Sequence, residues 1–242
     1  MTTTFDFGDG PVLAHQHPYG GGWVADTAKV TDTAYIGPDA WVWGNAKILD
    51  RAWLFGRAQV YDQATVSGHA KVLEDAKIGH YAMILDNAII HGFAWISHSA
   101  KISGNARVFE GAWVGDGAWV YGDAQVHGTA KIYGDPRIHG NAQVFGHARV
   151  YDEAEISEEA WVFDEAEIYG KAKIFGKARI FEKARVYHDA QIAAETWVFD
   201  SAEVRGDAQI FDGSRIFADA FGPRVIAGSR SWWRARKRER ST

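Results

Sequence analysis

The chain contains no cysteine among its 242 residues. This absence excludes disulfide bonds, thiol catalysis and metal sites built on thiolates. No run of 18 apolar residues occurs either, so the sequence predicts no transmembrane helix. The first twenty residues hold two aspartates, no basic residue before His15 and no continuous apolar stretch, unlike a secretory signal. We therefore expect a cytoplasmic protein.

The chain is rich in apolar residues, and its charges are unevenly distributed along the sequence. Hydrophobic residues make up 47% of the chain, which excludes a disordered protein. The net charge is −5, but the last fourteen residues carry six basic side chains against Glu239 alone. The tail is thus basic and the rest of the chain strongly acidic. The segment Arg234–Arg240 is interpreted either as a solvated end or as a contact for an acidic partner.

A period of six residues runs through most of the chain. From Val24 to Ile216 every sixth residue is aliphatic, and all of them except Leu54 are β-branched. Alanine stands two residues before nearly all of these aliphatics, and Gly or Asp usually stands two residues after. Alternating small and β-branched residues favour one face of a strand, while Gly and Asp tolerate turns. Each hexad is therefore predicted to be a short strand followed by a bend.

The outward residue after each aliphatic predicts the number of hexads in one coil. From residue 133 onward this position repeats at every third hexad, which gives a tyrosine column (Tyr133, Tyr151, Tyr169, Tyr187) and a phenylalanine column (Phe145, Phe163, Phe181, Phe199, Phe217). A spacing of 18 also places opposite charges on adjacent strands, which stabilises a sheet. The expected pairs are Glu153–Lys171, Glu155–Lys173, Glu159–Lys177, Glu165–Lys183 and Glu167–Arg185. The sequence thus predicts about eleven three-sided coils of 18 residues.

The hexads themselves carry a resemblance. Units such as residues 42–47 (VWGNAK) and 120–125 (VYGDAQ) resemble the hexapeptide-repeat superfamily. The resemblance implies an all-β fold, a left-handed parallel β-helix. The chain is most similar to long bacterial and phage repeat proteins without insertions, which often carry an acyltransferase label; a phage origin would make the protein virion-associated.

Solenoids expose an apolar surface and unpaired strands at both ends, so caps are expected there. We expect residues 1–21 to form an N-terminal cap and residues 22–220 to form the β-helix. Residues 221–242 are expected to hold a C-terminal cap and the basic tail.

The resemblance also implies an enzymatic alternative. Acyltransferases of this superfamily act in trimers, with a histidine as general base and coenzyme A or acyl carrier protein along the helix. His80 and His98 are the nominal catalytic candidates. However, the chain lacks the loops between coils that usually build such sites, and we expect no cofactor. The zinc-binding carbonic anhydrases of the superfamily are excluded, because no two histidines here are five residues apart.

One column combines histidines with carboxylates: Asp62, His80, His98 and Asp116 follow one another at 18-residue steps. Stacked imidazoles between two carboxylates could accept a divalent metal or titrate together near neutral pH. The alternative is a solvated ladder of Asp–His contacts at a corner of the prism.

The strongest surface signal is apolar. Outward positions hold Tyr81, Met83, Leu85, Ile89, Phe93 and Trp95, with Trp113 one coil beyond Trp95. A large exposed apolar area is typical of an interaction site. Aromatic ladders that only stabilise stacked strands, and stacking of a carbohydrate, are the alternatives. We therefore expect a non-enzymatic structural scaffold that forms a homo-oligomer, with a trimer as one form, or docks a protein partner.

Overall fold

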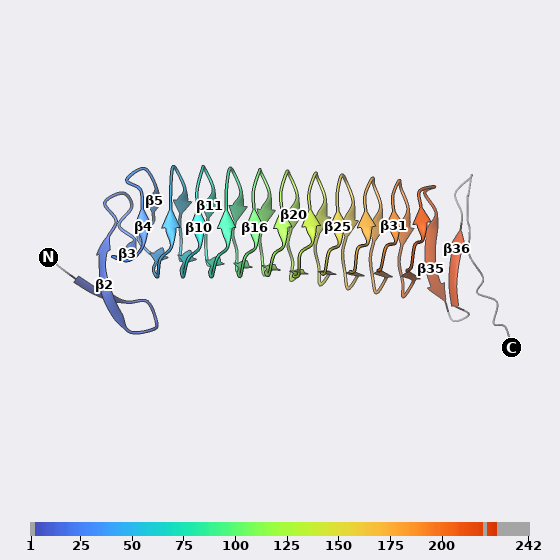
Figure 1. Ribbon diagram of the computed structural model, residues 1–242, viewed down its shortest axis with the longest axis horizontal. Coiled ribbons are helices and arrows are strands. Elements are labelled where there is room, and N and C mark those ends of the chain that lie inside the picture. Colours follow the sequence, from blue (N-terminus) through green and yellow to red (C-terminus); the bar gives the residue numbers. More distant parts are fainter. Residues whose placement is uncertain (1–2, 220–221, 227–242) are drawn as a thin grey trace.

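A computed structural model describes residues 3–219 and 222–226 and shows a parallel β-solenoid (Figure 1). Between residues 23 and 219 the chain winds through eleven coils, each with three short strands, stacked along one axis. The described residues contain no helix, and hence none that could cross a membrane. The predicted all-β, three-sided solenoid is confirmed.

Three sheets run along the solenoid, one for each side of the prism. Sheet A contains β1 (Thr3–Asp6), β2 (Pro11–Gln16), β3 (Trp23–Ala25), β6 (Trp41–Val42), β9 (Gln59–Val60), β12 (Lys77–Ile78), β15 (Trp95–Ile96), β18 (Trp113–Val114), β21 (Lys131–Ile132), β24 (Arg149–Val150), β27 (Glu167–Ile168), β30 (Arg185–Val186) and β33 (Glu203–Val204). Sheet B contains β4 (Lys29–Val30), β7 (Lys47–Ile48), β10 (Thr65–Val66), β13 (Met83–Ile84), β16 (Lys101–Ile102), β19 (Trp119–Val120), β22 (Arg137–Ile138), β25 (Glu155–Ile156), β28 (Lys173–Ile174), β31 (Gln191–Ile192) and β34 (Gln209–Ile210). Sheet C contains β5 (Tyr35–Ile36), β8 (Trp53–Leu54), β11 (Lys71–Val72), β14 (Ile89–Ile90), β17 (Arg107–Val108), β20 (Gln125–Val126), β23 (Gln143–Val144), β26 (Trp161–Val162), β29 (Arg179–Ile180), β32 (Trp197–Val198), β35 (Arg215–Asp219) and β36 (Gly222–Ile226).

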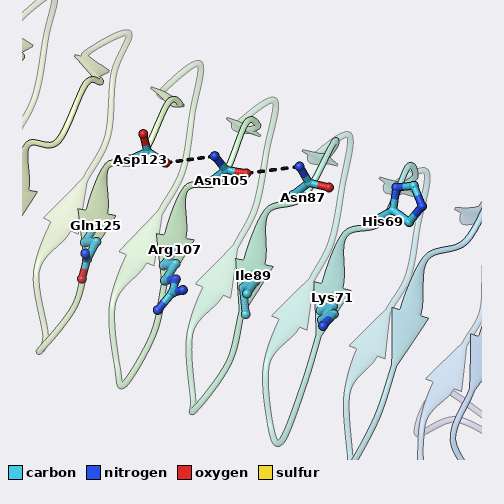
Figure 2. A pocket seen from close by; sticks show the side chains of 8 residues that line it. All are labelled: His69, Lys71, Asn87, Ile89, Asn105, Arg107, Asp123 and Gln125. Atoms are coloured by element: carbon cyan, nitrogen blue, oxygen red, sulfur yellow. Dashed lines mark hydrogen bonds between the residues drawn. The ribbon is translucent and has the colours of Figure 1, made fainter.

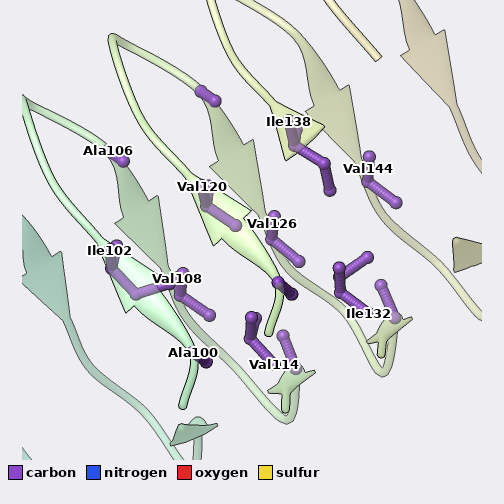
Figure 3. Packing of buried hydrophobic residues seen from close by; sticks show 14 of the residues in the cluster. Ala100, Ile102, Ala106, Val108, Val114, Val120, Val126, Ile132, Ile138 and Val144 are labelled. Atoms are coloured by element: carbon purple, nitrogen blue, oxygen red, sulfur yellow. The ribbon is translucent and has the colours of Figure 1, made fainter. Parts of the chain in front are cut away.

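The register confirms the predicted 18-residue coil. Val114 pairs with Ile132, and each aliphatic along the solenoid likewise pairs with the aliphatic one coil later. These aliphatics and most of the hexad alanines form one continuous core, in which nearly all are fully buried (Figure 3). Because every coil buries the same set of side chains, the interior is uniform along the axis.

The bends explain why the acidic residues stand where they do. The residue two after each aliphatic has a positive φ from Gly44 to Gly206, including non-glycine residues such as Asp62 (59°) and His80 (57°). This left-handed conformation is costly for residues with a Cβ. Carboxylates at the bend accept a hydrogen bond from the backbone N–H one coil later, as Asp152 does from Gly170 at 3.1 Å. The same contact is made by Asp50, Asp62, Glu74, Asp86, Glu110, Asp116, Glu158, Asp164 and Glu182.

Side chains also stack from coil to coil on the outside. Tyr133, Tyr151, Tyr169 and Tyr187 lie ring on ring at 4.8–4.9 Å, as the sequence predicts. On sheet C, rings stack without a break from His91 to Phe217. Four of the five expected charge pairs lie within 4.0 Å. The fifth, Glu159–Lys177, makes no ion pair.

Antiparallel hairpins flank the stack. Strand β2 pairs with both β1 and β3, so the β1–β2 hairpin covers the first edge of sheet A. Phe5 stacks on Trp23 at 4.4 Å, and Phe7 stacks on Trp43 at 5.5 Å. At the other end β36 pairs with β35. The basic segment Arg234–Arg240 lies outside the described residues.

Candidate functional site

The regular ladder of rings on sheet A is interrupted in the middle of the molecule. Trp43 stacks on Tyr61 at 4.7 Å, and the tyrosine stack begins again at Tyr133. Between them the same outward column holds three small residues, Gly79, Ser97 and Gly115. The column could have been found in the sequence at its 18-residue spacing, but the pattern was read only from residue 133 onward.

Large rings from neighbouring positions occupy the space over these small residues. The indole Nε1–H of Trp113 donates to the hydroxyl of Ser97 at 3.1 Å, and its ring stacks on Tyr133 at 6.1 Å. A Cβ added at Gly115 would lie 3.0 Å from the Trp113 ring, and one added at Gly79 would lie 2.5 Å from the Tyr61 ring. Small residues are therefore required here, because larger ones would push these rings away.

The interruption carries the most exposed aromatic side chains of coils four to six. Phe93, in the turn before β15, is 72% exposed; Tyr81, in the turn after β12, is 60% exposed; and Trp95 is 44% exposed. Trp95 and Trp113 lie on adjacent strands with their ring centroids 6.2 Å apart. We call Tyr81, Phe93, Trp95 and Trp113 the sheet A patch.

The structure corrects the expectation of one continuous apolar surface. Met83 begins β13 and Leu85 follows it, which places both at sheet B. Ile89 begins β14 on sheet C. Successive hexads turn to successive sides of the prism, so outward residues six apart do not share a face. Trp95 and Trp113 lie on adjacent strands of sheet A with Phe93 in the turn that leads into it, whereas Tyr81 lies in the turn that leads from sheet A to sheet B.

The histidine column lies along the turn beside the sheet A patch. The rings of His80 and His98 stack with centroids 4.8 Å apart and planes within 4°. At one end the Asp62 carboxylate accepts the backbone N–H of His80 at 3.0 Å. At the other end His98 Nδ1 lies 3.9 Å from Asp116. No three His, Asp or Glu side chains of residues 3–219 and 222–226 are gathered so as to hold a metal ion, and the geometry is that of a corner ladder.

Ser97 was missed in the sequence; it contacts the same nitrogen of His98, Nδ1, that Asp116 approaches, so the three residues do not form a catalytic relay. The Ser97 hydroxyl lies 3.1 Å from His98 Nδ1. The same oxygen accepts the Trp113 N–H, so Ser97 links the His98 ring to the Trp113 ring. Ser97 is fully buried, however, so it holds His98 and Trp113 in place and is not exposed to a substrate.

The tyrosines that border the interruption are held neutral. Partial burial raises the pKa of Tyr61 and of Tyr133. Burial within the stack, followed by the charge of Glu167, raises the pKa of Tyr151 to about 12. Tyr61, Tyr133 and Tyr151, on the two sides of the interruption, therefore stay uncharged at neutral pH.

Comparison with known proteins gives one match. The YdcK beta solenoid repeat family matches residues 100–116, which span β16, β17 and β18, about one coil. No curated protein and no solved structure matches the chain. The similarity supports the solenoid architecture.

Proposed function

We propose that this chain is a non-enzymatic β-solenoid scaffold that docks a second copy of itself through the sheet A patch. The observation that carries the proposal is the coincidence of two features in coils four to six. The stack of rings is broken there, and large apolar rings are exposed at the same place. The hairpin β1–β2 and strand β36 act as caps that leave the sides of the rod for docking.

The tryptophans of the sheet A patch differ from three others, Trp119, Trp161 and Trp197, in what covers their rings. Lys101 lies over Trp119 at 4.8 Å, Arg179 over Trp161 at 4.0 Å and Arg215 over Trp197 at 4.8 Å. Among the described residues no cation lies over Trp95 or Trp113. Intramolecular cation–π contacts cover the rings of Trp119, Trp161 and Trp197, whereas the apolar ring surface of Trp95 and Trp113 has no such cover.

A second copy suits this surface because a two-fold contact buries the same patch on both partners. Uncharged aromatic residues such as Trp and Tyr dominate the binding energy of interfaces when a partner excludes water from them. The stacked core beneath the patch keeps the rings at fixed spacing, so little conformational entropy is lost on docking.

Sedimentation velocity over a range of concentrations tests the proposal. Wild-type protein should associate, and Trp95→Ala should raise the dissociation constant about tenfold or more, the usual effect of losing an interface hot spot. Trp161→Ala is the matched control, because its ring lies under Arg179 on sheet C. A wild type that stays monomeric, or a control that weakens association equally, would contradict the proposal.

The acyltransferase alternative, a coenzyme A-dependent enzyme acting in a trimer, is favoured by one observation. The His98 ring is half exposed, and Ser97 contacts its Nδ1, so an imidazole is held at the surface where a general base could act. A thermal shift with coenzyme A, and acyl transfer to small amines lost in His98→Ala, would support the enzyme. Absence of both would remove it.

A further inference from the structure

A second feature lies on a different edge of the prism, where the turns from sheet B lead into sheet C. A hollow of about 810 Å³ is lined by His69, Lys71, Asn87, Ile89, Asn105, Arg107, Asp123 and Gln125. Figure 2 shows the turn residues in one row and the strand residues in a parallel row. The hollow thus runs along the solenoid axis and crosses four coils.

A second hollow of about 460 Å³ continues the first. It is lined by Asn141, Gln143, Glu159, Trp161, Lys177 and Arg179, which occupy the same two rows in the next coils. Gln125 and Gln143 are register partners on adjacent strands, so the two hollows meet without a gap in the rows. Together they form one axial groove over seven coils, about 29 Å long at 4.8 Å per strand.

The rim of the axial groove contains three amides among its seven residues, with His69, Asp123, Glu159 and Lys177 at the other places. Asn87 donates to Asn105 at 3.2 Å, and Asn105 donates to the Asp123 carboxylate at 2.9 Å (Figure 2). Three of the four asparagines in the chain stand in this row. An amide has two N–H donors and two lone pairs, so each keeps hydrogen-bonding capacity beyond these bonds. The rim therefore offers donors and acceptors at the spacing of the coils.

The floor of the axial groove holds three cations and no carboxylate, whereas its rim holds Lys177 together with the carboxylates of Asp123 and Glu159. The first residue of each sheet C strand from β5 to β35 faces outward, and none is acidic, whereas sheets A and B carry Glu167, Glu203 and Glu155 at this position. Lys71, Arg107 and Arg179 lie on the groove floor. Positive side chains in one row of an acidic protein attract an anionic ligand.

We propose that the axial groove binds a linear acidic polysaccharide lying along the solenoid axis. Hydroxyl groups both donate and accept, which matches the amides of the rim, and carboxylates match the basic floor. A pyranose ring in a linear chain advances by nearly the distance between coils, so successive sugars meet successive rim residues. An extended peptide repeats its side-chain direction at about 6.6 Å, which does not match the coil spacing. Single-stranded nucleic acid needs free ring faces for its bases, and Trp161 in the groove is covered by Arg179.

Calorimetric titration with oligogalacturonate tests the assignment, with a cello-oligosaccharide of equal length and oligothymidylate as comparison ligands. Oligogalacturonate should bind most tightly of the three. Asn105→Ala and Arg107→Ala should each weaken its binding about fivefold, the loss of one hydrogen bond or charge contact of about 1 kcal/mol.

The matched controls are Asn45→Ala, at the same hexad position in a turn between sheets A and B, and Arg137→Ala, at the same strand position on sheet B. Both should bind as wild type does. No binding of oligogalacturonate, equal or tighter binding of either comparison ligand, or equal losses in the control variants would overturn the proposal. The sheet A patch lies elsewhere, so Trp95→Ala should bind oligogalacturonate normally even where self-association fails.

Discussion

Two stretches of sheet A share one interior and differ on the outside. In coils seven to ten, Tyr133 to Tyr187 stack ring on ring and the strand charges pair, as Arg185 does with Glu167. In coils four to six the same column holds small residues, and Trp95 and Phe93 are exposed. In coils seven to ten the outward side chains contact one another and stabilise the stack of coils. The second stretch leaves its rings available to a partner.

In a repeat protein, a functional surface is expected where the outward side chains depart from the repeat while the core side chains keep to it. The core aliphatics under both stretches are fully buried, including Ile96 under the sheet A patch and Ile168 under the tyrosine stack. Nothing in the core therefore requires the change on the surface.

The largest expected effect concerns this shared core. Ile96→Ala and Ile168→Ala should each lower the free energy of unfolding by about 2–5 kcal/mol, because each leaves a cavity in a closely packed interior. Urea unfolding followed by circular dichroism measures both. The two losses should be similar, and a much smaller loss at Ile96 would show that the core is looser beneath the patch.

Much of the fold could be predicted because the period is almost unbroken. The stacking of Tyr151 on Tyr169 and the pairing of Glu155 with Lys173 both confirm the 18-residue coil that the sequence indicates. Aspartate at the bends was predicted from turn propensity alone. Its second role, accepting the N–H of the next coil, depends on side-chain direction and could not be seen.

The candidate site could be predicted only in part. Tyr81, Phe93, Trp95 and Trp113 were predicted by residue type together with Met83, which begins a strand of sheet B. Ser97 was missed, since nothing in one buried serine indicates that Trp113 and His98 both bind it. The axial groove was missed as well, because its two rows come from different positions of the hexad.

The next largest effect is a difference in stability loss between a variant in coils seven to ten and one in coils four to six. Tyr151→Ala should cost about 2 kcal/mol of stability, because the ring stacks on a neighbour on both sides. Trp95→Ala should cost the isolated protein less than Tyr151→Ala does, since Trp95 is 44% exposed. The comparison is made at concentrations where the protein is monomeric. If Trp95→Ala lowered the free energy of unfolding more than Tyr151→Ala does, the Trp95 ring would have a structural role in the solenoid.

A smaller effect should be the same in both stretches. Asp116→Ala and Asp152→Ala each remove a carboxylate that accepts a backbone N–H of the next coil. Each should lower stability by about 1 kcal/mol, measured by thermal unfolding. Asp135→Ala, in the turn position just after the bend, is the control and should be nearly neutral. A stability loss for Asp116→Ala well above that for Asp152→Ala would give the histidine column a structural role of its own.

The smallest effect is a dependence on alkaline pH. The pKa of Tyr151 in the folded protein, about 12, lies above that of an unfolded tyrosine, so the unfolded state loses its proton first as the pH rises. Stability from the tyrosine stack should therefore be intact below pH 10 and decline between about pH 10 and 12. Ultraviolet titration of the phenols measures this, with Tyr151→Phe as the variant whose decline is smaller. If the stability of Tyr151→Phe declined with pH as much as that of the wild type, groups other than Tyr151 would cause the decline.

Because the chain has no cysteine, one introduced thiol gives the most direct test of docking through the sheet A patch. Phe93→Cys places a thiol at a position that is 72% exposed, two residues before Trp95, and Phe211→Cys places one at a position that is 47% exposed, after β34 on sheet B. Each variant is treated with a flexible bis-maleimide at a concentration where the wild type associates. We expect a covalent dimer for Phe93→Cys and little covalent dimer for Phe211→Cys. Equal cross-linking of the two, or none at Phe93→Cys, would contradict it.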